Sequence, residues 1–365
     1  MTRRAAGLLV PVALVVLLAL VPRFGFGLGK VFAGELNSPG VLQLLAICLV
    51  FAGLALTYDL LFGFTGLLSF GHALYFAVGV YISDIAITKW GWSFWAAIAF
   101  TAAVGLVLPL VLGAVSLRVG GIAFAMVTLA FAQAGAILVQ KNPHNWTGGE
   151  EGLGYAYEHV PAGLVGIVNT KHLYWLALAY AVAVGVIVWW ATRSSPGHVW
   201  QAIRENERRV EVLGLRPHAY KLVAFVLASF LATAGGVVYM LLTGGANPTV
   251  TTADFTLALL LMVVIGGTGT LWGPLLGGLL YKYAEQRLTD LGGSSGVQDL
   301  PGILRVPLSE PLFLLGLLFV LIVFFLPGGI VGLATRGRAG GRALRRLEAA
   351  LRTAPTVAER PREGV

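Results

Sequence analysis

Few polar side chains occur inside the long apolar stretches of this sequence, and they are the first candidates for chemistry. Thr65, Ser69 and His72 fall in the glycine-rich stretch 62–72, and Gln133 falls in a separate apolar run. Irregular backbone at membrane depth is tolerated only where it faces protein or a wet cavity, so Thr65, Ser69 and His72 are predicted to line a translocation path. Gln133, inside an apolar helix, is a further candidate for the path and is expected to face another helix rather than lipid. The alternative is that the hydroxyls bond back to their own helix and that His72 is a satisfied interior side chain.

Other kinds of chemistry lack their usual residue patterns. The segment 25–30 reads G-F-G-L-G-K, but Phe24 and Val31 occupy the places where a phosphate-binding loop needs its first glycine and its Ser or Thr. No His/Glu metal spacing and no nucleophile with a neighbouring base occurs, and the lone Cys48 cannot form an intrachain disulfide. The sequence therefore predicts a protein that is not an enzyme, with no catalytic residue, no metal, no cofactor and no ATPase motif of its own.

The composition is that of a membrane protein, with 57% hydrophobic and only 12% charged residues. Apolar runs occur at about 5–21, 41–61, 66–88, 93–117, 120–140, 173–192, 222–243, 252–268, 272–289 and 311–333. A membrane-spanning helix needs about 20 residues. The runs therefore predict an all-α integral membrane protein, a polytopic bundle of about ten transmembrane helices.

The basic residues are distributed unevenly about these runs. If Arg3 and Arg4 lie in the cytoplasm and the spans alternate, 17 of the 25 Lys and Arg residues fall inside, eight of them in the tail 334–365. This asymmetry predicts that both termini are cytoplasmic, and it explains the net charge of +8 without nucleic acid. We expect a membrane domain over 1–333, followed by a basic tail over 334–365 that lies near anionic membrane lipid.

Two places in this scheme allow an alternative. The run 5–21 has the outline of a signal peptide, but it is long and no small-residue cleavage site follows it closely, so a retained first span is preferred. The stretch 252–289 could form one long span, which would put the tail outside. A break at the glycine-rich residues 266–270, with Pro274 close behind, gives two short spans and keeps the tail inside. Two spans are the prediction.

The segment 193–221 is a charged island between two apolar runs, with six basic and three acidic residues. Each such charge near the centre of a bilayer costs roughly 2.5 to 3.5 kcal/mol on insertion scales, so the segment must lie in water. Its apolar residues recur at helical spacing, Pro196 can start a helix and Gly214 can end it. We expect a short amphipathic helix that either rests on the bilayer and neighbouring spans or docks a soluble partner.

The segment 202–215, A-I-R-E-N-E-R-R-V-E-V-L-G-L, resembles the cytoplasmic coupling loop of branched-chain amino acid ABC-transporter permeases. Segments at 62–81, 118–133, 147–153 and 259–274 are similar to further segments of the LivM-type subunit of that family, in the same order and with similar spacing. Gln133 and the pair Tyr58-Asp59 depart from the family pattern. These departures bear on the identity of the substrate more than on the architecture.

The resemblance implies a membrane-spanning permease subunit of an ABC importer in the bacterial cytoplasmic (inner) membrane. Such a subunit forms half of a translocation path for branched-chain or related amino acids. Its implied partners are two ATP-binding cassette subunits, a second, homologous permease subunit and an extracytoplasmic substrate-binding protein, which docks on the external loop 141–172. The solute stays open among branched-chain amino acids, other amino acids, amides and urea-like molecules, as does the choice between a homodimer and a heterodimer of permeases.

The resemblance also assigns the helix in 193–221 to ATPase coupling, as a rigid lever. The residues carried over to that role are Ile203, Arg204, Glu205, Asn206, Glu207 and Gly214. The alternative function is a self-sufficient, ion-coupled secondary transporter of a small polar solute. That function usually needs buried carboxylates. The acidic residues of the predicted spans, Asp59, Asp84, Asp254 and Glu285, all lie near span ends.

Overall fold

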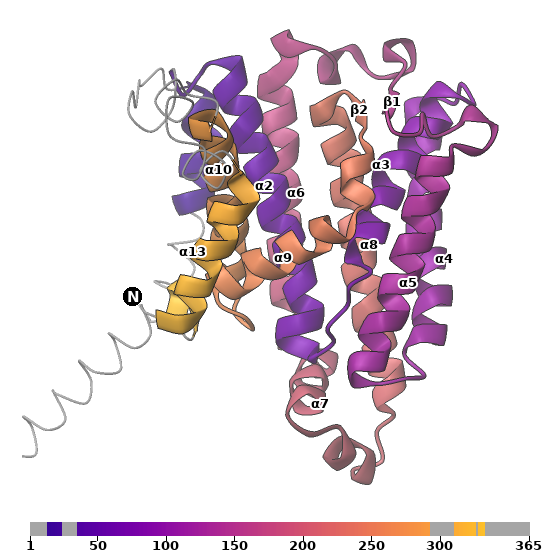
Figure 1. The fold of residues 1–365 in the computed structure, drawn as a ribbon, viewed down its shortest axis with the longest axis vertical. Coiled ribbons are helices and arrows are strands. Elements are labelled where there is room, and N and C mark those ends of the chain that lie inside the picture. The colour runs from indigo at the N-terminus through magenta and orange to yellow at the C-terminus, as the bar shows by residue number, and fades with distance from the viewer. Residues whose placement is uncertain (1–12, 24–34, 293–309, 326–327, 333–365) are drawn as a thin grey trace, which may run out of the picture.

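A bundle of α-helices makes up the computed structural model, which describes residues 13–23, 35–292, 310–325 and 328–332 (Figure 1). An apolar helix, Ala13–Arg23, comes first. The helices that follow are α2 (Pro39–Asp59), α3 (His72–Thr88), α4 (Phe94–Ser116), α5 (Gly121–Lys141), α6 (Thr170–Arg193), α7 (Ser195–Val212), α8 (Pro217–Thr243), α9 (Ala253–Gly266), α10 (Trp272–Gly292) and α13 (Pro311–Phe325). Helix α7 lies at the lower end of the bundle in Figure 1, opposite the strands β1 (Leu153–Gly154) and β2 (Gly245–Ala246).

Five described helices are long and apolar enough to cross a membrane: α4, α5, α6, α8, and α2 with its extension to Thr65. The helices 13–23, α3, α9 and the first part of α13 are apolar but shorter. The predicted all-α, polytopic membrane protein is therefore confirmed, whereas the number of spans stays a prediction. The first part of the run 5–21, the segment 25–30 and the tail 334–365 lie outside the described residues.

The connection between α2 and α3 is irregular, as the sequence predicted for 62–72. After Asp59 the helix widens into a π-helical turn, Leu60–Thr65, which ends at Gly66 with φ at 77°. The chain then runs without helical structure until α3 begins at His72. The apolar run 66–88 is therefore not one continuous helix, because its first residues belong to this break.

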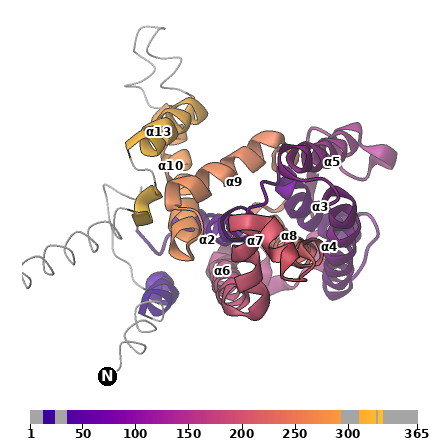
Figure 2. The ribbon, with the colours of Figure 1, turned by 90° about the horizontal axis from the view of Figure 1, so that it is seen from below.

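The break predicted at 266–270 is also present. Helix α9 ends at Gly266, and α10 begins at Trp272 after a turn in which Gly267 and Gly269 take φ values of 118° and 71°. Such positive φ values suit glycine because it has no Cβ. Seen from below, α9 runs across the bundle from α10 toward α5 instead of parallel to its neighbours (Figure 2).

Small residues bring the central helices close together. Gly236 of α8 lies against the backbone of α3. Gly53 of α2 and Gly235 of α8 both face the ring of Tyr180 of α6, whose hydroxyl donates to Leu231 O at 3.1 Å. Close approach at small residues is the usual basis of helix packing in membranes, where burial of apolar surface gives little driving force.

Candidate functional site

Helix α7 forms at the expected place in the charged segment and is fixed to the bundle by its apolar face. The hydroxyl of Ser194 accepts the N–H of Gly197 at 3.4 Å, which caps the start of the helix. Trp200 is 1% exposed, and its Nε1–H donates to Tyr220 O at 2.8 Å. Gly214, with φ at 82°, follows the end of the helix. The helix predicted between Pro196 and Gly214 is thus confirmed.

One part of that prediction is wrong, because α7 is not continuous. Asn206 has φ −162° and ψ 101°, an extended conformation inside the helix. Its Oδ1 accepts the N–H of Arg209 at 3.0 Å, so Asn206 acts as an N-cap for the turns that follow. The element therefore consists of two short helical pieces that meet at Asn206. Ile203 and Val210, one on each piece, are both buried against the bundle.

Arg204 reaches from α7 to both breaks in the membrane helices, and we call the cluster it forms with Asp59, Gly63 and Gly269 the inner node. The Arg204 guanidinium donates to Gly63 O in the π-helical turn after α2. Gly269, in the turn between α9 and α10, donates its N–H to Asp59 Oδ1 and Oδ2 at 3.0 and 3.1 Å. The Asp59 side chain is fully buried, and Arg204 contributes a favourable charge nearby. The inner node therefore joins α7, α2 and the α9–α10 turn.

The glycines of the inner node permit this close approach. A Cβ on Gly63 would overlap Asp59 Oδ1 and the backbone N of Gly269. A Cβ on Gly66 would lie 3.2 Å from Cγ of Arg204, and the φ of Gly66 is positive. Side chains at these positions would push the α2–α3 break away from α7 or from the α9–α10 turn.

The two glutamates of α7 differ in their surroundings. Glu207 forms an ion pair with Lys221 at the start of α8, in which the lysine side chain is 12% exposed and the glutamate 46%. Glu205 is exposed. Arg204 and Glu207 thus contact this chain, whereas Glu205 is presented outward.

The irregular segment between α2 and α3 is held by hydroxyl groups from other helices. The N–H of Phe70 donates to Thr128 Oγ1 of α5 at 3.1 Å, and the N–H of Ala73 donates to Thr256 Oγ1 of α9 at 3.2 Å. Ser69 Oγ accepts the N–H of Gly71 at 3.3 Å. These hydroxyls accept hydrogen bonds from backbone N–H groups that have no partner within a regular helix. Such groups need a partner because apolar surroundings offer no water.

The sequence-predicted residues Thr65, Ser69 and His72 are all buried in this region. Thr65 donates to Leu60 O of its own helical turn at 2.8 Å, as the alternative interpretation expected. Thr57 Oγ1 donates to Leu54 O and lies 2.9 Å from His72 Nε2. The single Thr57 hydroxyl hydrogen is thereby used, so His72 donates through Nε2 and its Nδ1 is an acceptor. Among the described residues this Nδ1 has no hydrogen-bond partner.

Gln133 does not join these three residues. It is exposed on α5, whereas Thr128 and Ala132 of the same helix face the bundle. Among the residues that the structure describes, no helix covers the Gln133 side chain. Its place on a translocation path therefore depends on what lies beyond these residues.

At the opposite end of the bundle, Asp84 of α3 holds the two loops that carry β1 and β2, and we call the cluster of Asp84, Thr88, Ala156 and Ala246 the outer node. Asp84 is fully buried; its Oδ2 accepts the N–H of Ala246 in β2 at 2.9 Å, and its Oδ1 accepts the Thr88 hydroxyl at 2.9 Å. Thr88 Oγ1 in turn accepts the N–H of Ala156 at 3.0 Å. Leu153 pairs with Ala246 in the two-stranded sheet.

Sequence reasoning missed several of these contacts. The sequence marked Asp59 and Asp84 as carboxylates near span ends, and Asp59 also as a departure from the family pattern, but nothing linked them to residues 269 and 246. Thr128 and Thr256 carry no signal beyond a hydroxyl inside an apolar helix, although such residues often satisfy broken backbone in membranes. Within the described residues no group of three or more His, Cys, Asp and Glu side chains could hold a metal ion.

Comparison with known families places this architecture. Residues 40–332 match the family model described as the branched-chain amino acid transport system permease component. The chain belongs to this family. The matched range includes both breaks, α7 and the strands β1 and β2, so every described residue from 40 to 332 falls within it. The resemblance inferred from the motifs is confirmed.

Individual relatives agree with this family membership. The chain is 25% identical to the LivM high-affinity branched-chain amino acid permease protein of Salmonella typhimurium, over 80% of this chain and 70% of the relative. It is 25% identical to the BraD permease protein of Pseudomonas aeruginosa, over 77% and 91%. Over a shorter stretch, 45% of this chain and 46% of the relative, it is 30% identical to the autoinducer 2 import permease protein LsrC of Klebsiella pneumoniae. No solved structure matches this chain.

Proposed function

We propose that this chain is a membrane-spanning subunit of an ABC importer and forms half of the translocation path for branched-chain or related amino acids, driven by ATP hydrolysis on partner subunits. The observation that carries the proposal is the inner node. Arg204 connects an exposed helix to both breaks in the membrane bundle, so a partner that moves α7 would move those breaks. ATP can drive such a change only if the partner binds the two conformations with different affinity.

Each end of the bundle is assigned a different kind of partner. Two ATP-binding cassette subunits dock at the end with α7, where Glu205 and Asn206 are exposed, and Gly214 allows the turn into α8. An extracytoplasmic substrate-binding protein docks on the loop 141–172 at the other end. In this orientation both termini are cytoplasmic in the bacterial inner membrane, and 334–365 is a basic tail beyond the membrane domain.

The second permease subunit covers the exposed face of α5. A polar amide in the lipid-facing middle of a span is costly, and such residues usually face another helix or a wet path. Gln133 has no such cover within the described chain, and a neighbouring subunit would provide it. In this arrangement Gln133 faces a path between the two permeases, whereas Thr65, Ser69 and His72 support the path from inside this subunit.

Reconstitution tests this function. The complete transporter in liposomes is expected to accumulate L-leucine only when ATP is supplied at the α7 face. The isolated chain is expected neither to hydrolyse ATP nor to accumulate L-leucine on an imposed proton or sodium gradient. Gradient-driven accumulation by the isolated chain would contradict the proposal and establish an ion-coupled carrier instead.

A further inference from the structure

A hollow of about 360 Å³ opens between the first turns of α2 and the last turns of α10. Its volume lies at the lower end of the range of ligand pockets, about 300 to 1,000 Å³. Farther along the two helices the space closes, because Gly278 of α10 packs directly against the backbone of α2 at Phe51 and Ala52. The residues of the hollow that matter below are Ser38, Gly40, Leu44, Ile47, Arg287 and Asp290. The proposed transport function uses none of them.

The length of α2 places the hollow at the edge of the membrane. With its extension, α2 covers 27 residues, Pro39–Thr65, and is apolar enough to cross a membrane. At about 1.5 Å per residue it is about 40 Å long, which matches a bilayer with its headgroup layers, about 40 to 45 Å. For a helix along the membrane normal, Ser38 lies at headgroup level and Ile47 about 14 Å deeper, in the hydrocarbon.

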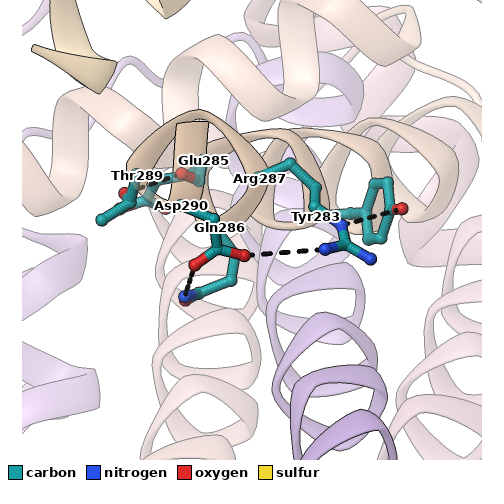
Figure 3. A network of polar contacts seen from close by, with 6 residues as sticks. All are labelled: Tyr283, Glu285, Gln286, Arg287, Thr289 and Asp290. Carbon is teal, nitrogen blue, oxygen red and sulfur yellow. Dashed lines mark hydrogen bonds and ion pairs between the residues drawn. The ribbon is translucent and has the colours of Figure 1, made fainter. Parts of the chain in front are cut away.

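The wall of the hollow formed by α10 carries two opposite charges. Figure 3 shows Arg287 between Tyr283 and Asp290 on this helix. Arg287 Nε donates to Tyr283 Oη at 3.2 Å, and Arg287 Nη1 lies 3.6 Å from Asp290 Oδ2. The second distance is too long for a hydrogen bond, so the ion pair is a loose one. The Arg287 side chain is 26% exposed and that of Asp290 53%, so both charges can be reached from outside.

The wall formed by α2 changes from polar to apolar along its length. Ser38 occupies the N-cap position, but within the described chain its hydroxyl makes no capping hydrogen bond and is left as a donor. Leu44 and Ile47, both half-buried, follow deeper in the hollow. A Cβ on Gly40 would meet nothing within 4 Å among the described residues, so the space beside it is open. The hollow is therefore charged at headgroup level and apolar below.

We propose that this hollow binds a phospholipid whose zwitterionic headgroup carries a primary amine, as in phosphatidylethanolamine. Arg287 and the Ser38 hydroxyl bind the phosphate, and the Asp290 carboxylate binds the ammonium. The start of an acyl chain packs on Leu44 and Ile47. This site goes beyond the proposed import function and does not depend on which solute the transporter carries.

The charges of the hollow favour this headgroup over those of other lipids. Arg287 and Asp290 are the charged residues that line it, and a zwitterion replaces their loose pair by two closer pairs without changing the net charge. Phosphatidylglycerol offers no cation to Asp290. The quaternary ammonium of phosphatidylcholine has no N–H to donate. A soluble phosphate would leave the apolar part of the hollow without a contact.

Native mass spectrometry of the full chain in detergent tests the site, with phosphatidylethanolamine as the probe. Phosphatidylcholine and phosphatidylglycerol with the same acyl chains are the comparison lipids. We expect the parent to retain phosphatidylethanolamine at concentrations at which neither comparison lipid is retained. Equal retention of the three lipids by the parent would show a non-selective lipid layer and would overturn the site.

Two variants disrupt the site by different means. Arg287→Gln with Asp290→Asn removes both charges and leaves the net charge unchanged, whereas Gly40→Leu fills the hollow and keeps the charges. Each should weaken phosphatidylethanolamine binding by about tenfold or more, as expected for lost charge-assisted hydrogen bonds or lost space. Gly185→Leu in α6 is the matched control, because a Cβ there also meets nothing within 4 Å among the described residues. Parental binding by Gly40→Leu would overturn the site even if the double variant does not fold.

The soluble headgroup glycerophosphoethanolamine separates a lipid site from a site for a free phosphate zwitterion. It has the phosphate and the amine but lacks the acyl chains that contact Leu44 and Ile47. We therefore expect it to displace phosphatidylethanolamine only at far higher concentration. Displacement at concentrations similar to those of the lipid itself would overturn the assignment to a lipid.

Discussion

The two ends of the bundle each use a buried aspartate to bind the backbone of a segment far along the chain, but the groups around the two aspartates differ. At each end a fully buried aspartate accepts the backbone N–H of a residue far along the chain: Gly269 for Asp59 and Ala246 for Asp84. The inner node adds a cation, Arg204, which belongs to an exposed helix. The outer node adds a neutral hydroxyl, Thr88, and a short sheet.

This difference indicates different roles for the two nodes. The hydrogen bonds of the outer node tie the loops that carry β1 and β2 to α3, so the node holds both loops in position. The inner node instead includes Arg204 of the exposed helix α7, and it joins elements whose backbone is already irregular. Movement applied to α7 would therefore reach the breaks at 60–71 and 267–271 first. Helix α3 runs between the two ends, from His72 beside the inner break to Asp84 in the outer node.

The largest effect is expected from Gly63→Ala, which would break the inner node. The added Cβ would overlap Asp59 and the Gly269 backbone, and overpacking of this kind costs about 1 to 3 kcal/mol. We expect a lower thermal unfolding temperature and almost complete loss of ATP-driven uptake. Gly185→Ala in α6 is the matched control, since nothing lies within 4 Å of a Cβ there. Parental uptake by Gly63→Ala would show that the node is not needed in the form described.

A smaller effect is expected from Asp84→Asn at the outer node. Asparagine offers one acceptor oxygen where the carboxylate offers two, so either the Ala246 N–H or the Thr88 hydroxyl loses its acceptor, at a cost of about 1 to 3 kcal/mol. Hydrogen exchange should rise at Ala246 and Ala156 but not in α7. The control is Glu158→Gln, an exposed change in the same loop. Increased exchange in α7 as well would contradict the separation of the two nodes.

The sequence predicted the features that neighbouring residues determine better than the contacts between residues far apart in the chain. Local signals sufficed for the helix between Pro196 and Gly214 and for the break at 266–270, because proline, glycine and charge act over a few residues. The extended backbone at Asn206 was missed, since the apolar spacing continues through it and only its cap on Arg209 marks the break.

Contacts between residues far apart in the sequence could not be predicted from such local signals. Asp59 accepts the N–H of Gly269, which lies 210 positions farther along the chain. The residues that flank Asp59 and Gly269 in the sequence give no sign of this contact. Gln133 was grouped with His72 because both are polar residues inside apolar runs, yet helical rotation carries Gln133 to the outer face of α5.

The most direct test of the account compares Arg204→Ala with Glu205→Ala in the complete transporter, measuring ATPase co-purification and L-leucine transported per ATP hydrolysed. Arg204 contacts the membrane bundle, so its loss should leave the ATPase subunits bound while transport per ATP falls by about tenfold or more, as expected for a lost charge-assisted hydrogen bond. Glu205 faces outward, so its loss should weaken co-purification instead. Parental transport per ATP with Arg204→Ala would contradict the claim that the inner node couples α7 to the membrane helices.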